Sequence, residues 1–227
     1  MASTLTWYGH GTFGLRTGKV DVLIDPFLAD NPLASAQPDD VPADFILVSH
    51  GHGDHIADAV PIAKRTGALC IANNEIAGWL GYQGLEAHGQ HIGGGHQHPF
   101  GHLKLTNALH GSQLPDGSDG GNPAGFLLTT KDGAKIYFAC DTGLFGDMRL
   151  IGEEGIDLAL LPIGDNYTMG PDDALRAVKL IEPKQVIPVH YDTWPLIEQD
   201  PQVWAKRVEQ ETRTKAHVLQ PGDTFEI

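Results

Sequence analysis

Cysteine is scarce in this sequence, since 227 residues contain only Cys70 and Cys140. Both lie in apolar contexts, so we expect two buried free thiols and no disulfide framework. Long hydrophobic runs are also missing, because no apolar segment approaches the roughly 20 residues that cross a bilayer. The N-terminal residues lack the basic and long apolar regions of a signal peptide. Together these absences predict a cytoplasmic protein without a membrane span.

Basic residues are few as well. The chain has 15 lysines and arginines against 29 aspartates and glutamates, which gives a formal net charge of −14. Such a surface repels phosphate backbones at long range, so it disfavours a nucleic-acid substrate without excluding one. The sequence has no internal repeat and no low-complexity linker, and 41% of its residues are hydrophobic. We therefore expect one globular domain that covers residues 1–227.

Histidine is abundant by contrast, with twelve residues that cluster along the chain. The densest stretch is residues 49–55, where His50, His52, Asp54 and His55 follow a His-x-His-x-Asp-His pattern. An apolar run at 44–48 precedes it and predicts a buried strand. A solvated, glycine-loosened loop is the alternative, but three imidazoles and a carboxylate at these offsets favour a metal site.

The remaining pattern predicts strands that come first as hairpins and then alternate with helices. Expected strands are 5–8, 12–16, 20–24, 69–72, 103–106, 125–130, 135–140, 157–162, 185–189 and 216–219, and expected helices are 57–65, 75–80, 145–151, 171–181 and 202–211. Two packed sheets with helices outside would fit this order.

Four further polar residues, His10, His110, Asp141 and His190, also follow apolar strands. Residues placed repeatedly at strand ends suggest a single site on one rim of the sheets. Taken alone, Asp141 could equally cap a turn before Gly143, and His110 could be a surface histidine. Together with the histidines and the aspartate of residues 50–55, however, a role in one shared metal site is favoured for Asp141 and His110.

The complete order, His-x-His-x-Asp-His and then His, Asp and His, resembles the metallo-β-lactamase superfamily over nearly the whole chain. Residues 7–10, 23–27, 140–143 and 163–170 look most like a branch of small bacterial metal-dependent hydrolases without assigned substrates, related to the ascorbate-6-phosphate lactonases. The resemblance implies an α/β fold of four layers, an αββα sandwich, with two divalent metal ions at one sheet edge.

Carried over by position, the resemblance assigns seven ligands. His50, His52 and His110 would hold the first metal; Asp54, His55 and His190 would hold the second; Asp141 would bridge both. An all-nitrogen and oxygen site suits zinc, with manganese or iron as alternatives. Cys140 should lie on the buried strand, where alternation would point it and Asp141 to opposite faces.

A metal-bridging hydroxide could then attack an electrophilic carbon or phosphorus. Asp54 would orient this nucleophile while holding its metal. His10 is either a catalytic residue that hydrogen-bonds the substrate or oxyanion, or a turn histidine. Asp25 is expected to support a metal ligand from behind as a hydrogen-bond acceptor, with a plain strand-end turn as the alternative.

The leading function is hydrolysis of a small ester, lactone or phosphate ester by a homo-oligomeric enzyme. The alternatives are a phosphodiesterase acting on a cyclic nucleotide, a phospholipid or nucleic acid, and a non-catalytic metal-binding sensor. The short separation of Asp141 and His190 leaves no room for the inserted domain of RNA-processing relatives. The Trp-x-Gly-His opening also resembles phospholipase D-type relatives that cleave N-acylethanolamine phospholipids.

Other features leave open interpretations. The loops at 28–43, 90–102, 111–123 and 164–170 are expected to determine the substrate. Tyr191 and Trp194 could line the cleft, although ordinary packing is favoured. Five histidines in a glycine-rich region are expected to form a loop near the cleft with mostly solvated imidazoles, with an accessory metal tract as the alternative; they are His88, His91, His96, His98 and His102.

Overall fold

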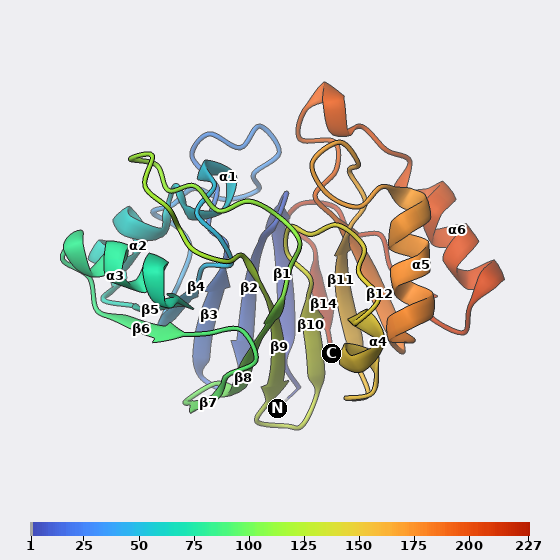
Figure 1. Cartoon of the computed structure of the whole chain (residues 1–227), viewed down its shortest axis with the longest axis horizontal. Coiled ribbons are helices and arrows are strands. Elements are labelled where there is room, and N and C mark those ends of the chain that lie inside the picture. Colours follow the sequence, from blue (N-terminus) through green and yellow to red (C-terminus); the bar gives the residue numbers. More distant parts are fainter. Residues whose placement is uncertain (1) are drawn as a thin grey trace.

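The computed structural model describes residues 2–227, and the strands of this part form two seven-stranded sheets (Figure 1). The first sheet contains, in spatial order, β14 (Thr224–Glu226), β1 (Thr4–Gly9), β2 (Thr12–Thr17), β3 (Val20–Ile24), β4 (Phe45–Leu47), β5 (Leu69–Asn73) and β6 (Ala87–Gln90). The second contains β13 (Lys215–Ala216), β12 (Gln185–Val189), β11 (Leu158–Pro162), β10 (Lys135–Phe138), β9 (Ala124–Thr130), β8 (Gly101–Asn107) and β7 (Gly95–His98).

Each sheet joins an antiparallel part to a parallel part. In the first sheet β1, β2 and β3 pair antiparallel, and β3 to β6 pair parallel. In the second sheet β7 to β10 are antiparallel, and β10 to β13 are parallel. Parallel strands end at the same edge of a sheet, so residues that follow them meet on one rim, as in other α/β folds.

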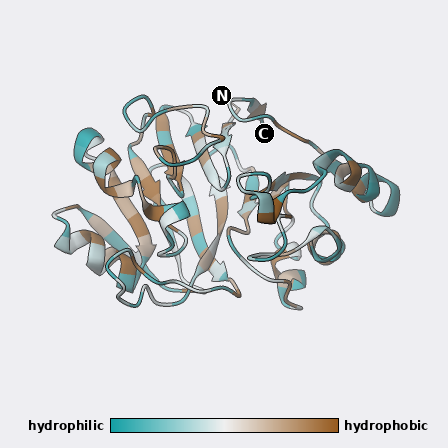
Figure 2. Ribbon diagram, turned by 90° about the horizontal axis from the view of Figure 1, so that it is seen from above, coloured by the Kyte–Doolittle hydropathy of each residue, from teal (hydrophilic) through white to brown (hydrophobic). Residues whose placement is uncertain are grey.

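Helices cover the outer faces of both sheets (Figure 1). The helices on the outer faces are α2 (Ala59–Thr66), α3 (Asn74–Tyr82), α4 (Met148–Gly152), α5 (Pro171–Ile181) and α6 (Pro201–Glu211), whereas α1 (Gly53–Ile56) and the short 3-10 helix η1 (Pro195–Ile197) lie at the upper rim. Residues of α2 and α3 share one hydrophobic cluster with the first sheet, and a second cluster runs between the sheets and beneath α5 and α6. Figure 2 shows hydrophobic segments on the strands and hydrophilic ones prominent on the outer helices. This confirms the predicted αββα sandwich.

Local chemistry explains why several elements begin where the sequence predicted. Helix α5 starts at Pro171, whose fixed φ suits the first turn, and two aspartates follow it near the positive end of the helix dipole. Asp200 caps α6 by accepting hydrogen bonds from two backbone amides. Both thiols are free, as predicted, with Cys70 buried and Cys140 half-buried. No helix among residues 2–227 is long and apolar enough to cross a membrane.

Three expectations were wrong in detail. The helix expected at 57–65 is α2, which begins two residues later, and a separate one-turn helix that was not expected, α1, lies inside the histidine motif, so Asp54 and His55 lie on a helical turn. The strand expected at 216–219 shrinks to β13, while β14 adds an edge strand beside β1. The histidine-rich region at 88–102 is not a loop near the cleft, because it supplies β6, β7 and the start of β8 at the end of the sandwich opposite α1 (Figure 1).

Candidate metal centre

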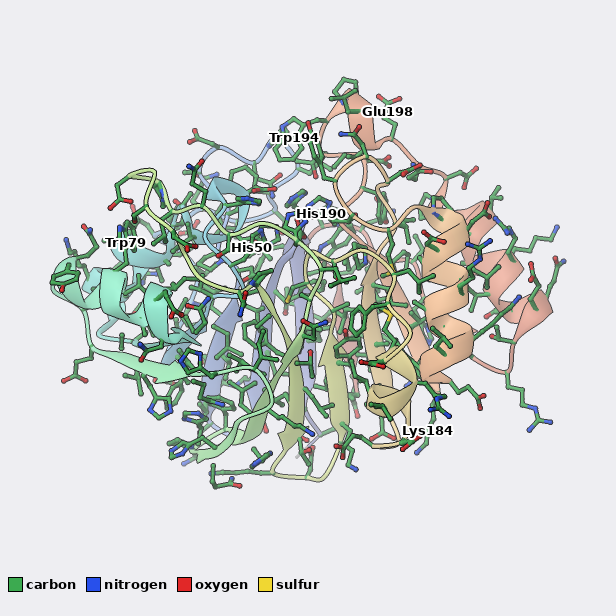
Figure 3. All side chains as sticks on the ribbon, in the orientation of Figure 1. His50, Trp79, Lys184, His190, Trp194 and Glu198 are labelled. Carbon is green, nitrogen blue, oxygen red and sulfur yellow. The ribbon has the colours of Figure 1, made fainter. Side chains whose placement is uncertain are left out.

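The polar residues that follow the strands meet at one rim of the sandwich. Asp25 follows β3 directly, and His190 follows β12 directly; Figure 3 shows His50 and His190 together at the upper edge of the sheets. The backbone turns sharply there, since His10, Asp25 and His190 have positive φ of 53°, 47° and 55°. Left-handed backbone costs about 1–3 kcal/mol at a non-glycine residue, so strain of this kind is concentrated at the rim.

One cluster consists of three histidines whose ring nitrogens converge. His52 Nδ1 lies 3.1 Å from His50 Nε2 and 3.2 Å from His110 Nε2. His50 is buried, and the other two are partly open to solvent. These are the three residues expected to hold the first metal.

The second cluster joins Asp54, His55 and His190, with Asp141 between the two clusters. Asp141 Oδ1 is 3.2 Å from His55 Nε2, and Asp141 Oδ2 is 3.0 Å from His190 Nε2 and 3.4 Å from His110 Nε2. Asp54 Oδ2 lies 3.7 Å from His55 Nε2 and 3.8 Å from His190 Nε2. The structure thus brings all seven expected ligands together, with Asp141 facing both clusters.

Asp25 lies behind both clusters and is buried. Its Oδ2 atom accepts hydrogen bonds from Ser49 Oγ at 2.6 Å and His55 Nδ1 at 2.9 Å, and its Oδ1 accepts the Ser49 amide at 2.7 Å. Because the Ser49 hydroxyl gives its proton to Asp25, it accepts the Nδ1 proton of His50 at 2.9 Å. In the neutral form of both histidines the proton therefore lies on Nδ1, and the lone pair of Nε2 faces the site, which is the tautomer that binds metals.

Buried charge dominates the electrostatics of the site. Burial lowers the pKa of His190, but the adjacent Asp141 carboxylate outweighs it and raises that pKa to about 9. Burial likewise opposes the charge of His55, yet three carboxylates raise its pKa well above the usual value. Burial would raise the pKa of Asp141, but His190 and His55 hold it well below its usual value. The buried carboxylate of Asp141 is therefore ionised, and positive charge beside it stabilises this form.

The donor set fits divalent metals. Ring nitrogens and carboxylates converge here, and three of these nitrogens are buried without a hydrogen-bond partner in the described part of the chain: His55 Nε2 and both ring nitrogens of His190. A buried polar atom without a partner is costly, and a cation would satisfy these atoms together. Groups of histidine and aspartate atoms within 4.8 Å of one another occur on both sides of Asp141. Nitrogen and oxygen ligands of this kind suit zinc, manganese or iron.

Cys140 does not lie on the buried strand, contrary to the prediction. β10 ends at Phe138, and Cys140 has a positive φ of 53°, so strand alternation does not apply to it. Cys140 and Asp141 border the same small space behind the site. Burial and the carboxylates of Asp25 and Asp141 raise the pKa of the Cys140 thiol well above its usual value. The thiol is therefore protonated at neutral pH and is a poor metal ligand.

His10 lies behind Asp54 and does not reach the cleft. Its ring is fully buried, with Nε2 3.1 Å from Asp54 Oδ2 and Nδ1 2.7 Å from Thr193 Oγ1. Burial is the main reason that the pKa of His10 falls to about 3, so its ring is neutral. The expected hydrogen bond from His10 to a substrate is therefore excluded in this conformation, because solvent does not reach the ring. His10 instead contacts the carboxylate of Asp54.

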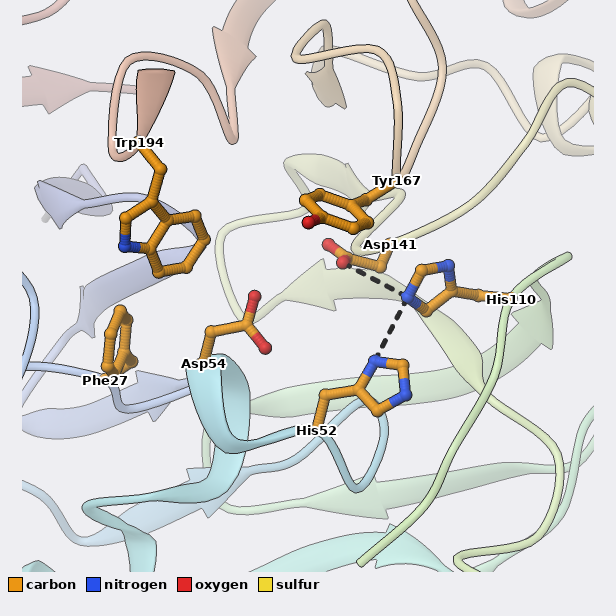
Figure 4. Close-up of a pocket in the computed structure, with 7 residues that line it drawn as sticks. All are labelled: Phe27, His52, Asp54, His110, Asp141, Tyr167 and Trp194. Carbon is orange, nitrogen blue, oxygen red and sulfur yellow. Dashed lines mark hydrogen bonds and ion pairs between the residues drawn. The ribbon is translucent and has the colours of Figure 1, made fainter. Parts of the chain in front are cut away.

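A cleft of about 500 Å³ opens above the two clusters (Figure 4). Asp54 and Asp141 face it from the site, and Trp194 faces it from the chain after β12. Packing alone was favoured for Trp194, so this is a correction, whereas Tyr191 is buried against Trp7. The complete lining is Phe27, His52, Asp54, His110, Asp141, Tyr167 and Trp194.

Some residues of the site were not identified from sequence. Tyr167 reaches the cleft from the loop at 164–170, which was expected to shape it, but no pattern distinguished this tyrosine. The sequence pattern predicted no role for Ser49, although a hydroxyl beside a candidate ligand histidine is a usable signal. Of the four loops expected to determine the substrate, only 164–170 contributes to the lining; no residue of 28–43, 90–102 or 111–123 lines this cleft.

Comparison with known proteins agrees with the geometry. A family described as the beta-lactamase superfamily domain matches residues 21–191. A "UPF0173 metal-dependent hydrolase" from Desulforamulus reducens is 51% identical over 232 residues, covering 98% of this chain and 99% of that protein. The solved structure of Igni18, described as a novel metallo hydrolase from Ignicoccus hospitalis, is 37% identical with a TM-score of 0.91 and full coverage of both chains.

A more distant structure shares the fold alone. CmlA, a diiron β-hydroxylase from Streptomyces venezuelae, is 14% identical with a TM-score of 0.78, covering 100% of this chain and 54% of CmlA. This fold therefore also carries oxidation chemistry, so the fold does not fix the reaction. The expected relationship to the ascorbate-6-phosphate lactonases stays a prediction. From the family match and the 51% identical relative, the chain belongs to the metallo-β-lactamase superfamily and, within it, to the UPF0173 metal-dependent hydrolases.

Proposed function

We propose that this protein is a binuclear metal-dependent hydrolase that cleaves a small ester, lactone or phosphate ester. The observation that supports it most is the position of Asp141, whose carboxylate faces ring nitrogens of both histidine clusters at 3.0–3.4 Å. A carboxylate between two nitrogen clusters suits two neighbouring cations, because it can be shared between them. The metal-dependent hydrolases among its relatives support the same reaction class.

The chain's own residues would divide the work as follows. His50, His52 and His110 would hold one cation, and Asp54, His55 and His190 the other, with Asp141 shared. When bound, two such cations supply a hydroxide nucleophile at neutral pH and stabilise the negative charge that develops on the scissile group. Asp25 fixes the rings of His50 and His55 from behind, so that their Nε2 atoms remain aimed into the site.

Asp54 is the carboxylate best placed to orient an attacking water. It borders the cleft with about a quarter of its side chain exposed, and His10 contacts it from the buried side. Although burial would raise the pKa of Asp54, His55 and His10 lower it far below its usual value. Asp54 is therefore ionised at neutral pH and can accept a hydrogen bond from water.

The cleft supports a small organic substrate. Its volume of about 500 Å³ suits a molecule of metabolite size. Phe27 and Trp194 face it opposite the histidines, so we propose a substrate with an apolar part next to the bond that is cleaved (Figure 4). Zinc is the proposed metal, with manganese or iron as alternatives. A cytoplasmic location and a homo-oligomeric state stay predictions from the sequence.

A substrate panel tests the proposal. Metal-loaded protein should hydrolyse at least one member of a set of esters, lactones, phosphomonoesters and phosphodiesters, and Asp54→Asn and His190→Ala should abolish that activity. His91→Ala, an exposed histidine outside the site, is the control and should retain it. If the wild type and both variants hydrolyse the panel equally, the enzyme proposal fails. The hydrolysed class also separates the ester and lactone reading from a phosphodiesterase.

The number of bound metals tests the binuclear part separately. Protein carrying both His50→Ala and His190→Ala should bind two fewer zinc ions per chain than the wild type, measured by elemental analysis after gel filtration. An unchanged count would show that these residues do not hold metal.

A further inference from the structure

Three histidines outside the rim come together where the edge strands of the two sheets meet. His88 lies on β6, the edge strand of the first sheet, and His96 and His98 lie on β7, the edge strand of the second. One ring nitrogen from each of them lies within 4.8 Å of the others. These strands are at the end of the sandwich opposite α1, away from the cleft (Figure 1).

The rings form a compact triangle. The ring centroids of His88 and His96 are 4.7 Å apart, those of His88 and His98 5.1 Å, and those of His96 and His98 4.7 Å. Alternate residues of a strand point to the same face, which explains why His96 and His98 both reach His88. Burial of apolar surface does not explain why the three rings lie together, because two of them are at least partly exposed.

The buried member, His98, is fixed in the tautomer that a metal site needs. The amide group of Gln90 donates from Nε2 to the carbonyls of Leu103 at 3.2 Å and Gly94 at 3.4 Å. Its Oε1 atom must therefore face His98 Nε2, 3.1 Å away, and accept a proton from it. The lone pair of His98 is left on Nδ1.

Packing holds this ring in place. His98 stacks on Phe100 with ring centroids 5.0 Å apart and an angle of 9° between the rings. Metal-binding histidines usually donate one ring N–H to a fixed acceptor and leave the other ring nitrogen free for the metal. His88 is half-buried and His96 exposed, so the cluster is open to an ion from solvent.

The charge of the cluster agrees with its geometry. Burial, with the neighbouring imidazoles, lowers the pKa of His98 to about 4. Burial and His96 also lower the pKa of His88. Both rings are therefore neutral at pH 7, which is the form that binds metals. Without an ion, three adjacent imidazoles gain little from being together.

We propose that His88, His96 and His98 form a further metal site, separate from the hydrolytic rim, that binds a divalent transition metal. Imidazole ligands suit Zn²⁺, Ni²⁺ and Cu²⁺, and three histidines with a water complete a tetrahedral zinc site. The ion would join the edges of the two sheets and so act as a structural clip.

Zinc binding to tag-free, metal-stripped, full-length protein tests the site. The variant His96→Ala removes an exposed ring, so the fold should survive, and His91→Ala is the matched control from the same region outside the cluster. We expect His96→Ala to bind one zinc ion fewer per chain than the wild type and His91→Ala to bind as many. An equal count in His96→Ala and wild type would overturn the proposal, whatever the rim binds.

Gln90→Leu tests the same site through the orientation of His98. Removing the acceptor should weaken binding of this zinc ion by about 10–100-fold, as loss of a ligand's hydrogen-bond partner does elsewhere. A titration of the His50→Ala and His190→Ala double variant isolates this ion from those at the rim. Unchanged affinity in the Gln90→Leu background would contradict the role assigned to His98.

Discussion

Asp25 Oδ2 accepts a hydrogen bond from His55 Nδ1 at 2.9 Å, and both side chains are almost completely buried. The same oxygen accepts the hydroxyl proton of Ser49, which in turn holds His50. One carboxylate therefore fixes a ring in each of the two histidine clusters. A change at Asp25 should consequently affect both halves of the candidate metal centre at once.

Asp25→Asn should lower the zinc affinity of both proposed metal positions. An amide presents only one acceptor atom, and its NH₂ group would face a donor, so His50 or His55 would lose its fixed tautomer. We expect a loss of about 10–100-fold in affinity, as is typical for such supporting residues. Competition with a zinc chelator measures it.

The matched control is Asp30→Asn, which changes an exposed aspartate near the same strand end. It removes the same formal charge without touching the histidines, so its zinc affinity should match the wild type. If Asp25→Asn and Asp30→Asn lose zinc affinity to the same extent, the loss of one negative charge explains the effect and the hydrogen bond does not. If neither variant loses affinity, Asp25 does not support the metal ligands.

His10→Asn should lower kcat while the protein keeps its full number of bound metals. The ring of His10 contacts Asp54 from the buried side and does not reach the cleft, so we expect it to position that carboxylate. The expected fall in kcat is about 10–100-fold, with KM little changed. Elemental analysis of the same sample gives the metal count. One metal fewer per chain would instead make His10 a direct ligand.

Much of the site could be predicted because its signal is local. His50, His52 and Asp54 lie within one short stretch, and His190 and Asp141 each follow an apolar strand, so their positions mark them as candidates and the family resemblance assigns them as ligands. The parallel parts of both sheets then bring these strand ends to one rim. The αββα layers were predictable for the same reason, since helices and strands alternate clearly in hydropathy.

What could not be predicted depends on contacts between distant segments. His10 is buried because the segment carrying Thr193 and Trp194 packs over it, and nothing near His10 in the sequence indicates this. The sequence predicts a loop where β6 and β7 lie, because edge strands with polar residues on both faces have no hydrophobic alternation. Their triangle of histidines depends on how the two sheet edges approach each other.

Trp194→Ala should raise KM and leave metal binding unchanged. The indole lines the cleft beside Phe27, with ring centroids 6.1 Å apart, and coordinates nothing. Loss of an apolar wall costs about 1–3 kcal/mol of substrate binding, or roughly 10–200-fold. The control Trp79→Ala removes a tryptophan of α3 away from the cleft (Figure 3). Equal KM values in both variants would remove Trp194 from the substrate site.

Gly11→Ala should weaken metal binding although glycine is replaced by the smallest side chain. A Cβ atom at Gly11 would lie 2.9 Å from Cε1 of the His55 ring, which cannot move aside because Asp25 holds it. We expect this overpacking to cost about 1–3 kcal/mol of unfolding free energy and to displace a ligand of the second cluster. Gly53→Ala is the control, because a Cβ there meets nothing within 4 Å although Gly53 lies inside the histidine motif. Chemical denaturation gives the stability of both variants, and zinc competition gives their metal affinity. If Gly11→Ala matches Gly53→Ala in both measurements, the ring of His55 is free to shift, and Asp25 does not hold it rigidly.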